Sequence, residues 1–257
     1  MIKYLSVMIM FFKTQESIPE GLGFSAFDLT HLLWLAAIIS GCAVACWFYR
    51  KMNSKSRNIM LKIVGSAVVF EEIIKNIAVI AVGEFGYGYL PFHLCGINIL
   101  LIAFDILRPT KLVRSFLYFF CIPGAALALL FPNWTEVPFW NFFHQHSFIV
   151  HALLVMYPML LITSGELKLK LSDMPKSLAL LIALAIPVYG LNLWWGTNFM
   201  FLMSPDTGNP LELFEKLFGS HLWGFPILLP VVMGIMYLPI FIVDKVQKSK
   251  KLQEMAL

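Results

Sequence analysis

Three polar side chains that could do chemistry lie close together in an apolar stretch of this chain. Residues 90–98 read LPFHLCGIN, which places the imidazole of His93, the thiol of Cys95 and the carboxamide of Asn98 within six residues. Each of these groups is costly in lipid unless it has a partner. A cysteine attacks a carbonyl carbon as its thiolate, and a nearby histidine can act as the base that forms the thiolate. These residues are therefore candidates for nucleophilic chemistry.

Helical geometry limits how these groups can cooperate. Pro91 predicts the first turn of a helix, and on a regular helix His93 and Cys95 project to nearly opposite sides. Cys95 and Asn98 share a face. We therefore expect the base for Cys95 to come from another helix. The alternative interpretation is that Cys95 is a small buried apolar residue, as cysteine often is.

An earlier apolar segment carries charges. Residues 70–76 read FEEIIKN, so that Glu71 and Lys75 share one helix face and Glu72 and Asn76 share another. A charge at mid-membrane costs about 3 kcal/mol, which predicts that these side chains face the interior of a helical bundle. Lys75 can neutralise one carboxylate, and the other needs a proton or a further partner. The group is either a structural ion pair or part of a site with a perturbed carboxyl.

A third segment is rich in histidine. Residues 144–151 read HQHSFIVH, in which His144, Ser147 and His151 fall on one helix face while His146 points elsewhere. Imidazoles at one depth could bind a metal or act as acid and base. The alternative is that they are interfacial histidines bonded to lipid headgroups, which suits His144 best. His151 lies deeper and fits that interpretation less well.

Two carboxamides follow in a later segment. Residues 189–200 read YGLNLWWGTNFM, and Asn192 and Asn198 need hydrogen-bond partners if they are buried. The neighbouring Trp194 and Trp195 are typical anchors at a membrane interface. We treat both asparagines as candidate substrate-binding residues.

The elements that position these residues are predicted by composition and hydropathy. Of the 257 residues, 59% are hydrophobic and only 13% are charged, whereas a soluble domain carries about 25% charged residues. Seven apolar segments are each near the length that spans a bilayer. They cover residues 27–49, 58–82, 90–107, 113–131, 144–163, 177–199 and 222–243. The sequence therefore predicts an all-α polytopic membrane bundle of seven transmembrane helices.

Lysine and arginine alternate between the connections. They are concentrated around residues 50–62, 108–114 and 168–176 and in the tail, and they are nearly absent from residues 83–89, 132–143 and 200–221. This pattern predicts an extracytoplasmic N-terminus and a cytoplasmic C-terminus. We expect an extracytoplasmic segment at 1–26, a membrane domain at 27–244 and a basic cytoplasmic tail at 245–257. Residues 1–12 lack a small-residue cleavage site, so we favour an interfacial segment or a frayed tail over a signal peptide.

The longest connection has structure of its own. Within the outer loop at 200–221, Asn209 and Pro210 predict an N-cap and first turn, and Gly219 predicts the helix end. Apolar residues recur at helical spacing between them. We expect a short amphipathic helix on the outer surface, acting either as a packed connector or as a lid.

Topology and spacing together place the polar residues at similar depth, in the outer half of the bilayer. We expect them to line a cavity open toward the outer leaflet. Its predicted catalytic residues are His93, Cys95 and His146, and its predicted substrate-binding residues are Glu72, Lys75, Asn76, Asn98, His151, Asn192 and Asn198.

At these residues the sequence resembles a bacterial family of integral membrane proteins, the YwaF type. The resemblance rests on LPFHLC at 90–95, on Phe142 and Phe143 followed by His146, and on Asn192 with GTNFMFL at 196–202, and it spans about residues 21–239. That family is distantly similar to eukaryotic membrane lipid enzymes. One branch comprises phospholipid acyltransferases that use a cysteine, and another comprises hydrolases of fatty-acid esters of hydroxy fatty acids that use a threonine and a histidine.

The resemblance implies that His146 is the histidine of the catalytic pair. The nucleophile corresponds less closely, because the acyltransferase cysteine falls just before a histidine. This chain has Phe92 before His93 and carries Cys95 nearly a turn later.

We therefore expect a lipid-acyl transferase or hydrolase of the plasma membrane, with membrane lipids as partners and an asparagine as oxyanion donor. One alternative is a small-solute transporter in which Glu71, Glu72 and Lys75 carry coupling. Another is a membrane-embedded binding or sensor protein, with or without a metal. The sequence contains no GxxxxGK, GxSxG, HExxH or Rossmann motif, and its basic residues lack interleaved aromatics. We expect no cofactor and no nucleic-acid partner.

Overall fold

The computed structural model describes residues 10–205 and 210–255, and every regular element in this part of the chain is helical. Among the described residues, five helical stretches are long and apolar enough to cross a membrane. They cover Leu29–Lys51, Lys111–Leu130, Phe142–Thr163, Asp173–Trp195 and His221–Val243. The second predicted segment also forms a long helix but carries three charges in its apolar part, and the third forms a helix of 14 residues.

All seven predicted segments are helical, with shifted bounds. The long elements are α2 (Leu29–Lys51), α3 (Ser54–Ala81), α4 (Leu94–Leu107), α5 (Lys111–Phe116) continuing through η3 (Leu117–Cys121) into α6 (Ile122–Leu130), α7 (Phe142–Thr163), α8 (Asp173–Trp195) and α10 (Gly224–Met255). The shorter elements are η1 (Gln15–Ser17), η2 (Tyr87–Tyr89), η4 (Phe199–Phe201), α9 (Leu211–Phe218) and η5 (His221–Trp223).

Side-chain caps explain several of the helix starts. The carboxylate of Asp28 accepts from the amide of His31 at 2.8 Å and begins α2. Asn53 begins α3 by accepting from the amide of Ser56 at 2.9 Å. Each cap satisfies one of the amides that a first helical turn leaves without an intrahelical partner. Polar residues in the connections therefore set where α2 and α3 begin.

The fourth segment is irregular in its middle. Leu117–Cys121 form a π-helical stretch, and all five residues are buried. Pro123 follows at the start of α6. Proline has no amide hydrogen and its ring collides with the carbonyl four residues earlier, so a wider turn ahead of it relieves the collision. The stretch lies in the main core and contacts α4, α7 and α10.

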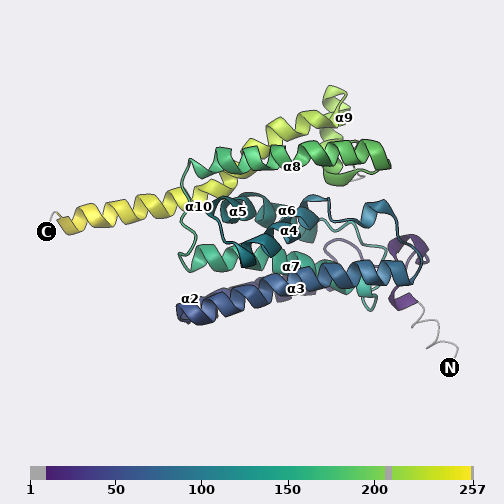
Figure 1. The fold of residues 1–257 in the computed structure, drawn as a ribbon, viewed down its shortest axis with the longest axis horizontal. Coiled ribbons are helices and arrows are strands. Elements are labelled where there is room, and N and C mark those ends of the chain that lie inside the picture. The colour runs from purple at the N-terminus through teal and green to yellow at the C-terminus, as the bar shows by residue number, and fades with distance from the viewer. Residues whose placement is uncertain (1–9, 206–209, 256–257) are drawn as a thin grey trace.

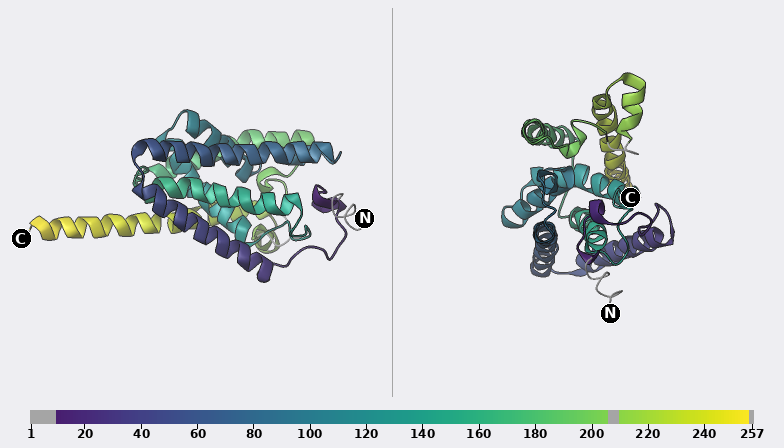
Figure 2. Two further views of the ribbon diagram at one scale, coloured as in Figure 1. Left: turned by 90° about the horizontal axis from the view of Figure 1, so that it is seen from below. Right: turned by 90° about the vertical axis from the view of Figure 1, so that its right-hand side faces the viewer.

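The helices form a bundle centred on α7, which contacts α2, α3, α4 and α6. Figure 1 shows α2 and α3 along one side of this bundle and α8, α9 and α10 along the other. Helix α8 packs mainly on α5, and α10 packs on the π-helical stretch. Figure 2 shows α10 extending well beyond the other helices, so the predicted tail at 245–257 continues the last helix as far as Met255.

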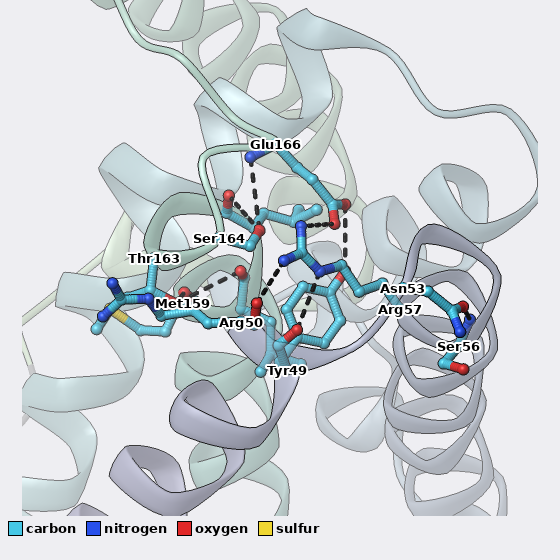
Figure 3. Close-up of polar contacts among 11 residues, drawn as sticks. Tyr49, Arg50, Asn53, Ser56, Arg57, Met159, Thr163, Ser164 and Glu166 are labelled. Carbon is cyan, nitrogen blue, oxygen red and sulfur yellow. Dashed lines mark hydrogen bonds and ion pairs between the residues drawn. The ribbon is translucent and has the colours of Figure 1, made fainter.

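The connections rich in lysine and arginine gather at one end of the bundle, which we call the basic end. There Arg57 at the start of α3 contacts Glu166 after α7, with 3.5 Å between Nη1 and Oε1. Tyr49 of α2 donates to the same carboxylate at 3.1 Å. Figure 3 shows these groups meeting around Glu166. The described N-terminal residues lie at the opposite end (Figure 1).

A second polar network lies deeper at the basic end. The Asp105 side chain has no exposed surface and accepts from Arg114 Nε at 2.9 and 3.1 Å. The hydroxyl of Tyr157 donates to the same carboxylate at 2.9 Å, and the amide of Thr110 donates at 3.3 Å. Because these residues belong to α4, α5, α7 and the connection before α5, the network ties three helices together.

At the far end, Glu84 fastens the N-terminal segment to the loop after α3. Its carboxylate accepts from the Ser17 hydroxyl at 2.5 Å, from the Thr14 amide at 3.0 Å and from the Thr14 hydroxyl. Burial disfavours the charged form of Glu84, but these hydrogen bonds outweigh burial and lower the pKa of the carboxyl below its usual value. The expectation of an interfacial segment at 1–12 falls mostly outside the described residues.

The predicted amphipathic helix of the outer loop is α9. It ends at Gly219, whose φ of 72° is the left-handed conformation expected after a helix. The predicted cap Asn209 lies outside the described residues. Leu213, Leu217 and Phe218 are exposed, which gives this short helix an apolar face without a cover among the described residues.

Candidate functional site

The clearest acid–base arrangement joins α3 and α7. Nδ1 of His146 lies 3.1 Å from Oε2 of Glu71. The imidazole stacks on Phe142 at 5.8 Å and is only 6% exposed. Within the described part of the chain, Nε2 of His146 makes no hydrogen bond. A carboxylate on one ring nitrogen and a free second nitrogen form the arrangement that orients a histidine as a base.

Lys75 neutralises Glu72 and not Glu71. Its Nζ lies 2.6 Å from Oε1 of Glu72 and donates to the backbone carbonyl of Tyr89 at 3.0 Å. Asn76 donates to the same carboxylate oxygen at 3.0 Å and to the carbonyl of Glu72 at 2.8 Å. Glu72, Lys75 and Asn76 therefore form one group whose charge is balanced internally. The carboxylate left for a further partner is Glu71, which the sequence did not place in the site.

The start of α4 differs from the prediction. The helix begins at Leu94, and His93 is its N-cap with extended backbone, so Pro91 lies before the helix and not in its first turn. The reason is a close approach within the motif. A Cβ on Gly96 would lie 2.6 Å from the backbone of Pro91, so the absence of a side chain lets the incoming segment lie on the first turn of α4.

His93 faces the segment that follows α8. The amide of Met200 approaches Nδ1 of His93 at 3.4 Å. The ring packs against Phe199 at 5.2 Å and Phe201 at 5.7 Å. His93 therefore joins the start of α4 to η4. Because His93 lies before the helix, the prediction that His93 and Cys95 project to opposite sides of one regular helix does not apply. The two side chains do have different neighbours.

Cys95 and Asn98 lie on the inner side of α4. Cys95 is half-buried, packs against the main core and makes no hydrogen bond with either His93 or His146. Asn98 is fully buried, and neither its amide nitrogen nor its oxygen has a partner among the described residues. Buried carboxamides are normally hydrogen-bonded, so an orphan of this kind needs an explanation. Asn98 is a polar group inside the bundle that remains free to bind something else.

The side chains of the two remaining asparagine candidates, Asn192 and Asn198, are hydrogen-bonded within the turn that follows α8. Asn192 accepts from the Phe199 amide at 2.8 Å and the Thr197 hydroxyl at 2.9 Å, and it donates to the Phe199 carbonyl at 3.0 Å. Asn198 accepts from the Ser204 amide at 3.1 Å and donates to the Ser204 carbonyl at 2.9 Å. Both side chains stabilise the turn after α8, so these hydrogen bonds give both asparagines a structural role.

The other histidines of α7 are also bonded within the bundle. His151 bonds the carbonyl of Ser147 at 2.7 Å and stacks on Trp134 with ring centres 5.3 Å apart. His144 is fully buried, lies 3.1 Å from the carbonyl of Val137 and accepts from the Trp34 indole at 3.0 Å. The headgroup interpretation of His144 is therefore wrong, because the N-terminal segment and α2 cover that face of α7.

The predicted residues do not line one cavity. The pair formed by Glu71 and His146 and the group around Glu72 link α3 with α7 and the loop before α4, whereas His93 and Asn192 meet the segment after α8. None of the predicted site residues lines the pocket between α5 and the connection after α7 or the smaller pocket beside it. Among the described residues, no group of three His, Cys, Asp or Glu side chains could hold a metal ion.

Comparison with known families identifies one match. Residues 26–237 match the family model described as the TMEM164 family. The match covers six of the seven long helical stretches completely and ends within α10. No curated protein and no solved structure matches the chain.

Proposed function

The chain belongs to the TMEM164 family of membrane proteins, and we propose that it is an enzyme that transfers or hydrolyses lipid acyl groups. The observation that carries the proposal is the contact between Glu71 and His146 inside the bundle. The resemblance of residues 90–95 and of His146 to the YwaF type, a family distantly similar to membrane lipid enzymes, supports the same chemistry. Its partners are then the membrane lipids that supply the acyl ester.

His146 is the proposed base. Glu71 accepts the hydrogen of Nδ1, which fixes the tautomer and leaves the lone pair of Nε2 to take a proton. The ring is only 6% exposed, so its orientation is set by the surrounding protein. Positioned proton transfer of this kind contributes a rate factor of about 10²–10⁴.

Cys95 is the proposed nucleophile and Asn98 the proposed oxyanion donor. Helix α4, which carries both, contacts α3 and α7, which carry the base. In the reaction, the thiol passes its proton to His146 and the sulfur bonds to the ester carbonyl carbon. The lipid alcohol then leaves with that proton, and water or a second alcohol releases the acyl group. The amide of Asn98 is free to donate to the carbonyl oxygen as it gains charge.

The test uses purified protein in liposomes containing a phospholipid with a fluorescent acyl chain. We expect Cys95→Ala and His146→Gln to abolish acyl release or transfer. Glu71→Gln should lower the rate by about 10²–10⁴-fold without changing the apparent affinity for the lipid. Cys42→Ala, which removes a thiol on α2, is the matched control and should keep full activity. Activity that survives in His146→Gln, or wild-type protein that turns over no acyl lipid, would refute the proposal.

The same proposal includes a topology. We propose that all seven helical stretches cross the plasma membrane, with the basic end and the C-terminus in the cytoplasm and Glu71 and His146 in the outer half. The gathering of Lys and Arg at one end supports this orientation. A reporter fused after Leu257 should be active only in the cytoplasm, and an extracytoplasmic reporter would reverse the orientation.

A further inference from the structure

A cavity lies at the basic end of the bundle, and neither Glu71 nor His146 belongs to its lining. It has a volume of about 440 Å³ and lies between the start of α5 and the connection that follows α7. Four cationic side chains line it, those of Lys111, Arg114, Lys168 and Lys170. A volume of this size lies in the range of small-molecule sites and is sufficient for a phosphorylated headgroup.

The wall formed by residues 165–170 alternates between core and cavity. Leu167 and Leu169 are buried in the main core, whereas Lys168 and Lys170 are exposed. The Leu167 amide also donates to the carbonyl of Leu161 at 3.0 Å, which fastens the strand-like segment to the end of α7. The two leucines therefore anchor the wall and present both lysines outward.

The carboxylates near the cavity are engaged elsewhere. Glu166 is the acidic residue of the lining, and its two oxygens meet Arg57 and Tyr49 (Figure 3). Behind the wall, Asp105 bonds Arg114 through both oxygens, and Asp173 lies 2.7 Å from Lys111.

Lys168 and Lys170 take part in no ion pair within the described residues. The cavity therefore has an excess of positive charge that the protein itself does not neutralise.

A neighbouring pocket offers an unused hydroxyl. This pocket of about 120 Å³ shares Lys111 with the larger cavity and is also lined by Ser115, Asp173 and Lys176. Ser115 is 1% exposed, and its Oγ has no hydrogen-bond partner among the described residues. Buried hydroxyls normally have a partner, so this donor points to a ligand with acceptor oxygens.

We propose that the cavity at the basic end binds a phosphate group, carried by either an anionic lipid headgroup or a soluble phosphorylated molecule. Arg114 and Lys111 line it, and Lys168 and Lys170 supply the charge that the ligand neutralises. Basic pockets between membrane helices at the headgroup level are suited to anionic headgroups. The inference does not depend on the proposed acyl chemistry, because the cavity shares no residue with it.

The test compares a double variant with a matched control. Lys168→Gln together with Lys170→Gln removes two charges from the cavity wall and leaves the Asp105 network intact. Lys55→Gln together with Lys62→Gln removes two exposed charges from α3, outside the cavity. In one arm, detergent-solubilised full-length protein is titrated with pyrophosphate by calorimetry. In the other, lipids retained from phosphatidic acid vesicles, with phosphatidylcholine as carrier, are counted by native mass spectrometry.

If each lysine contributes what a basic residue contributes near an anionic surface, the cavity variant should bind about 30-fold more weakly. The control should bind as the wild type does. Retention of phosphatidic acid without pyrophosphate binding identifies a lipid headgroup, and pyrophosphate binding in detergent identifies a soluble ligand. Absence of binding in both arms overturns the proposal, as does an equal effect of the two double variants. Circular dichroism and thermal melting of each variant confirm that the comparison is between folded proteins.

Discussion

Replacing Arg114 with glutamine tests the polar network that ties α4, α5 and α7 together. Arg114 is the only cation bonded to Asp105 among the described residues, and the Asp105 side chain has no exposed surface. The variant leaves a buried carboxylate that keeps its hydrogen bonds from Tyr157 and Thr110 but has no cation. Removing one partner of a buried ion pair costs about 3–5 kcal/mol. Because these two hydrogen bonds remain, we expect the lower part of that range.

Two further variants divide this cost into its parts. Tyr157→Phe removes one hydrogen bond to a charged acceptor and should cost about 1.5–3 kcal/mol. The double variant Arg114→Gln with Asp105→Asn removes the stranded charge as well. It should therefore be more stable than Arg114→Gln alone. The control is Lys111→Gln, which replaces a side chain that is 48% exposed. Its partner Asp173 is buried but keeps the hydrogen bond from the Lys170 amide at 2.7 Å, so this change should cost less than Arg114→Gln does.

The assay is denaturant titration of each purified variant in mixed micelles, followed by loss of helical circular dichroism. The reasoning requires the order of stability to be wild type, then Tyr157→Phe, then Arg114→Gln. It is refuted if Arg114→Gln loses no more than Lys111→Gln does. It is refuted as well if the double variant is less stable than Arg114→Gln alone, because the isolated charge would then not be the source of the cost.

Three shorter predictions concern single positions. Gly96→Ala places a Cβ within 2.7 Å of the backbone of Pro91 and should lower the free energy of unfolding by about 1–3 kcal/mol in denaturant titration. In the control Gly190→Ala the new Cβ meets no atom, so its stability should not fall. Equal effects of the two variants would contradict the close approach. Asn98→Leu removes an unpartnered buried carboxamide, so it should raise the melting temperature while lowering acyl turnover; unchanged turnover would remove Asn98 from the site. The lowered pKa of Glu84 means that its ionised form stabilises the docked N-terminal segment at neutral pH, and that this stabilisation is lost as the pH falls below about 4. The protection of the amides of residues 10–20 against hydrogen exchange, relative to the intrinsic rate at each pH, should fall at that pH. Glu84→Gln should lower this protection already at pH 7, and protection insensitive to both changes would contradict the role of Glu84.

Most of the fold could be predicted from the sequence because the bilayer imposes simple rules on it. Apolar runs near 20 residues, such as those at 27–49 and 144–163, form α2 and α7 because a backbone in lipid must bond within its own helix. The short helix before Gly219 was predicted for a similarly local reason, since a left-handed glycine ends a helix wherever it occurs. These features depend on neighbouring residues and need no knowledge of packing.

The partners of the polar residues could not be predicted in this way. Glu71 and Glu72 are adjacent in sequence, yet one bonds His146 of α7 and the other bonds Lys75 of its own helix. Rotation of α3 against α7 decides between these outcomes, and a single sequence does not specify that rotation. Likewise, Asn192 resembled a site residue by type, but its side chain accepts two hydrogen bonds and donates one within the turn after α8.

The stretch LPFHLCGIN shows both what the sequence determines and what it leaves to packing. Its sequence alone determined that polar groups lie at the end of an apolar helix and need partners, because lipid offers none. Only the tertiary structure decided that Pro91 packs on Gly96, that His93 is the N-cap residue of α4 and faces Met200, and that the buried carboxamide of Asn98 has no hydrogen-bond partner among the described residues. The need of a polar group for a partner in lipid follows from its residue type, whereas hydrogen bonding between helices depends on their orientation and depth, which packing sets.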